Sequence, residues 1–445
     1  MRSADPRRMV LTALLVLLQT GSATMAGSPP VRTLEAGPPA RATFDAATFD
    51  ALVQEGIHAG AYPGAVLIVG RHDTLLFAKG YGHLTWARTS PAADPESTLY
   101  DLASLTKVIA TTTALMLLVE RGQVRLDAPV ATYVPAFNAA GTSAITVRQL
   151  LTHTSGLRAD IPDAELKAIP DSAALMARVL RETPRVAPGS RVIYSDLNAI
   201  LLGEVVRHVT REPLDVFATR EIFDPLGLRE TMFRPPARLR PRIAPTGVWH
   251  GLSIAGVVND GSAFRLRGVS GNAGLFAPAL DVARFAQFVM RGGTCPPPDG
   301  RRLLRSETVR LFTAKATDFG PKSEARALGW QAVPTGESVS SAGTLFGPHT
   351  FGHTDQPRVR AACPPAVHGP QAGPGCRRRC GGPGVRCVLS VPLSSTTANA
   401  ASVDNPSRPC AGGTGNSDLS RSRFRIRRAW RRSGFRSPRS PRRCT

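Results

Sequence analysis

The sequence predicts an α/β protein in which an antiparallel sheet, flanked by helices, is built from both ends of one domain around a helical subdomain. Two short apolar segments around a polar turn, residues 65–69 and 75–78, indicate an early β-hairpin. A mainly helical stretch follows, and extended apolar segments return only at residues 328–333 and 346–354. Strands on both sides of a helical middle favour one sheet assembled from both ends of the domain.

Periodic apolar residues predict the main helices, which are expected at residues 45–59, 171–181, 197–209 and 282–290. A longer helix begins in the polar segment 100–107 and continues through the apolar run 108–119. It should end near Gly122, because glycine readily adopts the left-handed conformation of a C-terminal cap.

The N-terminal 42 residues are predicted to lie outside the globular domain. Residues 1–26 have the pattern of a secretory signal peptide, with three arginines, a ten-residue apolar core and small residues at the end. An uncleaved anchor is the alternative, but ten apolar residues are too few to span a bilayer, so we expect no stable membrane anchor. Residues 27–42 are rich in Pro, Gly and Ala and predict a linker. The protein is therefore expected to be secreted or periplasmic.

The domain is expected to cover residues 43–355, and residues 356–445 have a different composition. This last segment holds eighteen Arg, two Asp, no Lys and no Glu, so it carries most of the net charge of +22. It also holds six of the seven cysteines. Such a composition cannot bury much apolar surface, which predicts a disordered tail. The main domain is only weakly basic, so we expect it not to bind nucleic acid.

Ser104 and Lys107 are the first candidate catalytic pair. Residues three apart share a helix face, so the hydroxyl and the amine can meet. A serine is a poor nucleophile unless a neighbouring base takes its proton, and burial among apolar residues could lower the pKa of Lys107 enough for that task. The alternative is a helix-capping serine with a surface lysine.

Tyr194 follows the turn at Pro188 and Gly189 and precedes a helix. A tyrosine near Ser104 and Lys107 could relay protons, whereas the alternative is a core tyrosine with a satisfied hydroxyl. Several segments of the chain, taken in their order, resemble the serine β-lactamase-related family. This family includes class C β-lactamases, D-Ala-D-Ala carboxypeptidases and related esterases. The matching segments are residues 104–107, 150–157, 188–195, 223–228 and 271–276.

The resemblance implies a β-lactamase/transpeptidase-like fold, with Ser104 as nucleophile, Lys107 as its base partner and Tyr194 as second acid/base group. The family has Asn where this chain has Asp196, a candidate for substrate binding. An ionised carboxylate cannot donate a hydrogen bond and would favour a charged Lys107, so we favour a helix N-cap role for Asp196. We expect His153 to be structural, as part of a turn.

His353 and Thr354 are the candidates for the third family motif, for which the resemblance implies substrate binding. Asp355 stands where the family has glycine, and the resemblance ends there. The family continues with a strand and a helix, and it has an oxyanion-hole N–H at a position expected near Gln356. We favour an out-of-frame reading of the gene as the origin of the tail, which would remove both elements and impair activity. The alternative is a genuine basic segment that binds a polyanion.

The expected function is that of a monomeric serine hydrolase that forms an acyl-enzyme with esters, β-lactams or D-Ala-D-Ala-type amides. Its partner would be a small-molecule or peptidoglycan-type substrate. The departures at Asp196 and Asp355 favour an esterase or peptidase-like role over a β-lactamase. A catalytically silent relative that acts as a binding protein is the alternative. The chain has no zinc-ligand spacing and no dinucleotide or phosphate-loop glycine pattern, so we expect no metal and no cofactor.

Overall fold

A computed structural model describes residues 45–71, 74–249, 252–320, 324–333, 350–354 and 388–391 of the chain. These residues all belong to one compact unit. The predicted signal peptide, the linker, and the tail except for residues 388–391 lie outside the described residues.

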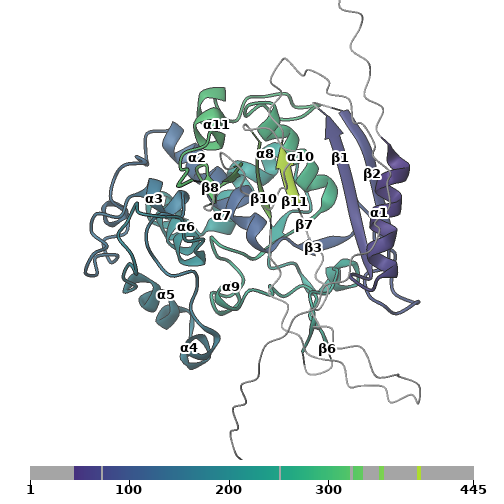
Figure 1. Cartoon of the computed structure of the whole chain (residues 1–445), viewed down its shortest axis with the longest axis horizontal. Coiled ribbons are helices and arrows are strands. Elements are labelled where there is room, and N and C mark those ends of the chain that lie inside the picture. Colours follow the sequence, from purple (N-terminus) through teal and green to yellow (C-terminus); the bar gives the residue numbers. More distant parts are fainter. Residues whose placement is uncertain are drawn as a thin grey trace, which may run out of the picture. The chain divides into compact units, whose positions relative to one another are not determined.

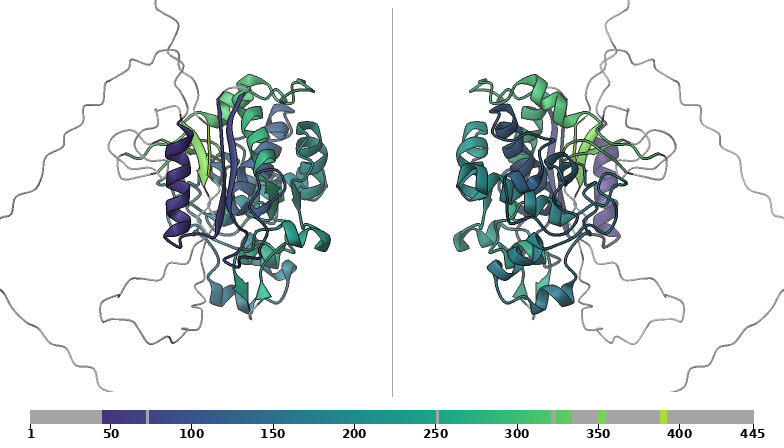
Figure 2. Two further views of the ribbon diagram at one scale, coloured as in Figure 1. Left: turned by 90° about the vertical axis from the view of Figure 1, so that its right-hand side faces the viewer. Right: turned by 90° about the vertical axis from the view of Figure 1, so that its left-hand side faces the viewer.

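The N-terminal part consists of one helix and one hairpin. Helix α1 (Ala46–His58) begins at Asp45, whose carboxylate accepts hydrogen bonds from two backbone N–H groups of the first turn. Strands β1 (Gly64–Arg71) and β2 (Thr74–Gly82) pair antiparallel. The helix lies along the hairpin, where Asp50 forms a 2.8 Å ion pair with Lys79 of β2 (Figure 2). The predicted early helix and hairpin are confirmed.

The late strands form a four-stranded antiparallel sheet in the order β11-β10-β9-β8. Their bounds are β8 Ala325–Arg326, β9 Gln331–Ala332, β10 Phe351–Thr354 and β11 Val388–Val391. Among the described residues this sheet is separate from the β1–β2 hairpin, whereas a single sheet was expected. No described strand joins β11 to β1, so the hydrogen-bonded ladder is not continuous between them.

Strand β11 comes from within the segment that was expected to be disordered. It pairs antiparallel with β10, with Leu389 opposite His353. Its Val-Leu-Ser-Val sequence is apolar and includes two β-branched residues, so it suits a strand even though the flanking composition does not. The out-of-frame interpretation of the tail removes the strand that follows in the family, but here β11 pairs with all four residues of β10.

A third sheet, which the sequence did not predict, lies next to the start of the central helix. It has the order β3-β7-β4, with β3 Leu99–Asp101, β7 Leu275–Pro278 and β4 Met232–Phe233. A two-stranded ribbon is formed by β5 (Val248–Trp249) and β6 (Leu252–Ser253). Strands of two to four residues are too short to show an alternating apolar pattern, which explains why they were missed.

The central helix is continuous from Ala103 to Glu120 but changes type along its length. It begins as a 3-10 turn η1 (Ala103–Leu105), continues as the π-helix η2 (Lys107–Thr112) and ends as α2 (Thr113–Glu120). Gly122 has φ of 70°, as expected for a residue that ends a helix. Among the described helices this is the one long and apolar enough to cross a membrane, but 78% of that window is buried inside the protein, as in a core helix.

In Figure 1, helices α3 (Val147–Leu151), α4 (Asp163–Ala168) and α5 (Ser172–Leu180) lie on the side of the central helix away from the β1–β2 hairpin, whereas α10 (Ala279–Met290) lies next to β1. Helix α6 (Asp196–Thr210) contacts both η2 and α2, and α10 packs on β1. The predicted helices at 171–181, 197–209 and 282–290 are confirmed as α5, α6 and α10. The helices other than α1 and the central one are η3 Val130–Thr132, α3 Val147–Leu151, α4 Asp163–Ala168, α5 Ser172–Leu180, α6 Asp196–Thr210, α7 Leu214–Ala218, η4 Thr219–Phe223, α8 Asp224–Leu226, η5 Ala237–Arg242, α9 Gly261–Arg265, α10 Ala279–Met290 and α11 Ser306–Thr313.

An aromatic cluster joins the late sheet to α10. Trp330 is fully buried in the turn between β8 and β9. Its ring lies parallel to that of Phe285 at 6.4 Å and meets the edge of Phe351 at 5.2 Å. Because these three residues come from α10, the β8–β9 turn and β10, the cluster fixes β10 relative to the helices.

We expect Trp330→Ala to lower the free energy of unfolding by about 3–5 kcal/mol, because it removes a large buried side chain and leaves a cavity. Urea denaturation of the variant and the wild type measures the difference. Leu75→Ala is the control, since Leu75 is 44% exposed and should cost much less. Equal losses in the two variants would contradict the role of the cluster.

Candidate active site

Ser104 and Lys107 are in direct contact at the start of the central helix. The Lys107 Nζ donates a hydrogen bond to the Ser104 Oγ at 2.9 Å and another to the backbone carbonyl of Asn272 at 2.9 Å. The same Nζ lies 2.8 Å from an Asp196 carboxylate oxygen. Lys107 is only 4% exposed, whereas Ser104 is half-buried. The contact expected from the three-residue spacing is present, and the surface-lysine alternative is wrong.

The charge state of Lys107 differs from the one expected from the sequence. Burial alone would lower its pKa, but the Asp196 carboxylate and Tyr194 outweigh that effect and raise the pKa above the usual lysine value. The expectation that burial keeps Lys107 partly neutral is therefore wrong in the free protein. At neutral pH the Nζ is a cation that donates hydrogen bonds.

Asp196 does not cap a helix. It is the first residue of α6, and the N-cap position belongs to Ser195. The Ser195 hydroxyl donates to the Arg158 carbonyl at 2.6 Å and makes no side-chain cap hydrogen bond. The favoured N-cap interpretation of Asp196 is thus wrong, because the buried ammonium of Lys107 binds the carboxylate.

Tyr194 lies between two cations. The Lys107 Nζ and the Arg326 Cζ are each 5.1 Å from the centre of its ring. The His153 ring is 4.6 Å away. The Tyr194 hydroxyl is buried and has no hydrogen-bond partner among the described residues. The alternative of a core tyrosine with a satisfied hydroxyl is therefore not supported by the part of the chain that the structure describes.

A loop that begins at His153 holds the segment around Tyr194. The His153 carbonyl accepts from the Ile193 N–H at 2.8 Å, and the His153 Nδ1 accepts from the Ser195 N–H at 3.1 Å. Burial, together with the charges of Arg326 and Lys107, holds the pKa of His153 well below its usual value. The ring is therefore neutral, which leaves Nδ1 free to accept. His153 is structural, as expected, and it orients Tyr194.

His353 and Thr354 lie on β10, which faces the same site. The His353 ring centre is 6.0 Å from that of Tyr194, and neither ring nitrogen has a hydrogen-bond partner in the described part of the chain. Burial is the main reason why the pKa of His353 lies well below its usual value, and the positive charges of Lys107 and Arg326 lower it further. The His353 ring is therefore neutral rather than cationic. Thr354 is half-buried beside it. Asp355 and the N–H expected near Gln356 lie outside the described residues.

Asn272 and Arg326 belong to the site but were not singled out from the sequence. Asn272 receives the Lys107 hydrogen bond through its backbone, and Gly271 allows its loop to come that close. A Cβ at Gly271 would lie 2.0 Å from the Ala199 carbonyl of α6. Arg326 is 4% exposed and carries the second charge over Tyr194. A backbone contact and a buried arginine leave no recognisable spacing in the sequence.

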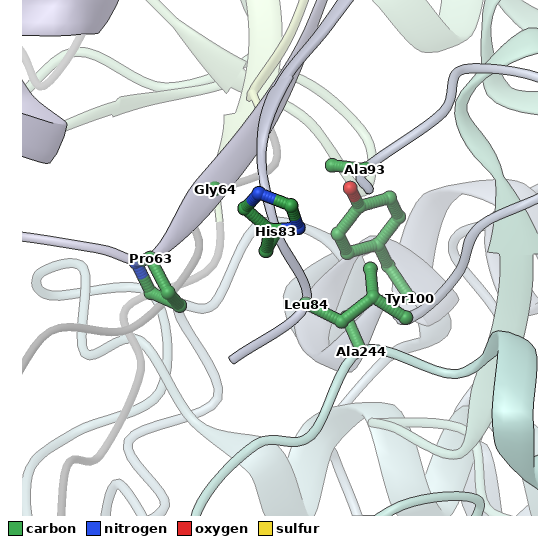
Figure 3. A pocket seen from close by; sticks show the side chains of 7 residues that line it. All are labelled: Pro63, Gly64, His83, Leu84, Ala93, Tyr100 and Ala244. Atoms are coloured by element: carbon green, nitrogen blue, oxygen red, sulfur yellow. The ribbon is translucent and has the colours of Figure 1, made fainter. Parts of the chain in front are cut away.

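A small, mostly apolar cavity lies elsewhere, at the end of the first hairpin (Figure 3). Gly64, His83 and Tyr100 are among its lining residues. It contains none of the residues of the Ser104 site, so that site stands apart from this cavity.

The two buried neutral histidines predict acid sensitivity of the fold. An unfolded histidine takes up a proton near pH 6.5, whereas His153 and His353 stay neutral when folded. The stability that these two histidines contribute is therefore fully present above about pH 7. It is lost as the pH drops, so the free energy of unfolding falls by up to about 1.4 kcal/mol per pH unit for each histidine. Urea denaturation at pH 7.5 and pH 5.5 measures the slope. His353→Gln should flatten it, and His58→Gln, at an exposed position in the last turn of α1, should leave it unchanged; equal slopes in all three proteins would contradict this account.

The chain is similar to several known proteins. A family model described as Beta-lactamase matches residues 49–355. A protein of Escherichia coli O157:H7 named "Putative D-alanyl-D-alanine carboxypeptidase" is 32% identical, with 68% of this chain and 76% of that protein covered. A penicillin-binding protein homologue from Caulobacter crescentus has the same fold, with a TM-score of 0.55 and 23% identity over 69% of this chain and 85% of its own. A hydrolase with promiscuous acyltransferase activity also has the same fold, with a TM-score of 0.54 and 22% identity over 68% of this chain and 86% of its own. The chain belongs to the beta-lactamase family.

Proposed function

We propose that this protein is a serine hydrolase that works through an acyl-enzyme on Ser104. The 2.9 Å hydrogen bond between the Lys107 Nζ and the Ser104 Oγ is the observation that carries the proposal. In the first step the Oγ bonds to the substrate carbonyl carbon, the leaving group departs, and the serine proton passes to it. In the second step water hydrolyses the ester on Ser104 and restores the hydroxyl.

The proton path follows from the charges. A cationic Lys107 can stabilise a developing alkoxide but cannot accept a proton. We assign reactivity to the form in which Lys107 has lost its proton, and we assign to Tyr194 the transfer of a proton toward the leaving group. The family resemblance supports these roles. The activity should therefore rise with pH.

Among the possible substrates we place esters first, ahead of D-Ala-D-Ala-type amides and β-lactams. A neutral His353 offers no positive charge to a substrate carboxylate, so charge attraction at this position does not favour the last two classes. The relative named as a carboxypeptidase supports the amide substrate, and the hydrolase with acyltransferase activity supports acyl transfer more generally. The N-terminal 26 residues support action outside the cytoplasm.

We expect a burst of p-nitrophenol when the protein meets p-nitrophenyl acetate, because acylation of Ser104 would outpace hydrolysis of the acyl-enzyme. Ser104→Ala should abolish the burst, and Ser97→Ala, an exposed serine that hydrogen-bonds to Asp94, should keep it. Mass spectrometry after a fluorophosphonate probe should place the label on Ser104. A protein that shows neither burst nor label would be a silent relative that acts by binding. A chromogenic β-lactam in parallel ranks the substrate classes.

We expect Asp196→Asn to move the rising limb of the pH–rate profile to lower pH. The variant removes the carboxylate that holds the pKa of Lys107 above its usual value while keeping the shape of the side chain. More of the reactive form is then present near neutrality. The profile of kcat/KM between pH 6 and 10 measures the shift. Asp127→Asn, at an exposed ion pair with Arg148, is the matched control and should leave the profile in place. An unmoved limb in Asp196→Asn would exclude Lys107 as the titrating group.

A further inference from the structure

The Asp101 carboxylate joins two backbone segments at the end of β3. One oxygen accepts the Ala103 N–H at 3.0 Å, and the other accepts the Asn259 N–H at 2.8 Å. The first segment leads directly into Ser104. The second leads into Asp260. No sequence motif assigns a role to Asp101.

Ala103 has an unusual backbone conformation. Its φ is +44°, in the left-handed region that residues with a Cβ disfavour. Because Ala103 immediately precedes Ser104, this angle determines the direction in which the chain presents the serine. The hydrogen bond from the Ala103 N–H to Asp101 stabilises the turn where the backbone itself does not favour it.

The second segment closes a ring of contacts. The Asp260 Oδ1 accepts from the Asn272 Nδ2 at 3.1 Å. The Asn272 carbonyl accepts from the Lys107 Nζ at 2.9 Å, and that Nζ donates to the Ser104 Oγ. Starting at Asp101, the path therefore runs through Asn259, Asp260, Asn272 and Lys107 to Ser104, and returns through Ala103. Asp101 touches both arms of this ring, through the backbone N–H groups of Ala103 and Asn259.

We propose that Asp101 is a positioning residue for Ser104, which it fixes by holding the left-handed turn at Ala103 and the loop at Asn259. The proposal rests on Ser104 as the nucleophile of the proposed function. A shift of about 1 Å in the position of a reacting group can cost about 100-fold in rate. Asp101 should therefore affect the rate constant of acylation more than substrate binding.

A double-mutant cycle tests the proposal, with Asp101→Ala, Ala103→Gly and the double variant. We expect Asp101→Ala to lower the acylation rate constant with p-nitrophenyl acetate, read from the burst, by about tenfold or more, with the substrate dissociation constant within about twofold. Glycine adopts a positive φ without strain, so Ala103→Gly alone should keep full activity. The double variant should acylate at least about threefold faster than Asp101→Ala, because with glycine at 103 the turn no longer needs the carboxylate.

The melting temperature of the same four proteins gives a second readout that does not depend on activity. Asp101→Ala should lower it, and Ala103→Gly should reduce that loss. Asp94→Ala is the matched control, because Asp94 also accepts two backbone N–H groups, of Glu96 and Ser97, in a turn away from the site. It should lower stability without lowering the acylation rate, and its effect should not change with glycine at 103.

Two results would overturn the proposal. One is an unchanged acylation rate in Asp101→Ala, and the other is a loss that glycine at 103 does not reduce in either rate or melting temperature. If the wild type shows no burst and no probe label on Ser104, the proposed function fails. Coupling of positions 101 and 103 in the melting temperature would then still establish the turn-holding contact, whereas absence of that coupling would remove it as well.

Discussion

The ion pair between Lys107 and Asp196 is the interaction on which the site depends. Its two charged atoms lie 2.8 Å apart, with side chains 4% and 12% exposed. Burying two charges carries a desolvation cost of several kcal/mol for each ion, which only close pairing and further hydrogen bonds can offset. Lys107 has those further bonds, to Ser104 and to the Asn272 carbonyl. The central helix, α6 and the 270–274 loop must therefore come together in one arrangement.

This pair also sets the chemistry of its surroundings. The positive charges of Lys107 and Arg326 reinforce burial in keeping His153 and His353 uncharged. A neutral His153 can accept the Ser195 N–H, which holds the segment of Tyr194 in place. Asp260 experiences the opposite effect, because burial and the negative charge of Asp196 raise its pKa. The charges of this pair thus add to the effect of burial on the protonation of three neighbours, His153, His353 and Asp260.

Local rules predicted the parts of the site that lie close together in sequence. The spacing of Ser104 and Lys107 was enough to predict their contact, because both lie in the first turns of one helix. Asp196 was misassigned because its partner is 89 positions away in the chain, and a helix start gives a strong local signal for capping. Arg326 was missed for the same reason. Its importance comes from packing against Tyr194, which no local pattern records.

The fold was predictable to a similar extent. The hairpin and the long amphipathic helices carry a clear period, and they were found. The β3–β7–β4 sheet has strands of two to four residues, so its existence depends on which segments fold beside one another. Strand β11 shows the same point more strongly, since four residues pair with β10 within a segment whose overall composition favours disorder.

The approach of the 270–274 loop to α6 has a consequence for how the site can vary. Gly203 and Gly271 face each other there, and a Cβ at Gly203 would lie 3.2 Å from the Gly271 Cα. The spacing between loop and helix is set by main-chain atoms, so side-chain rotation cannot change it. The same loop carries the Asn272 carbonyl that accepts from Lys107, so this acceptor is held by the contact of two backbones. A side chain larger than glycine at either position would displace the acceptor and loosen its hold on the ammonium group.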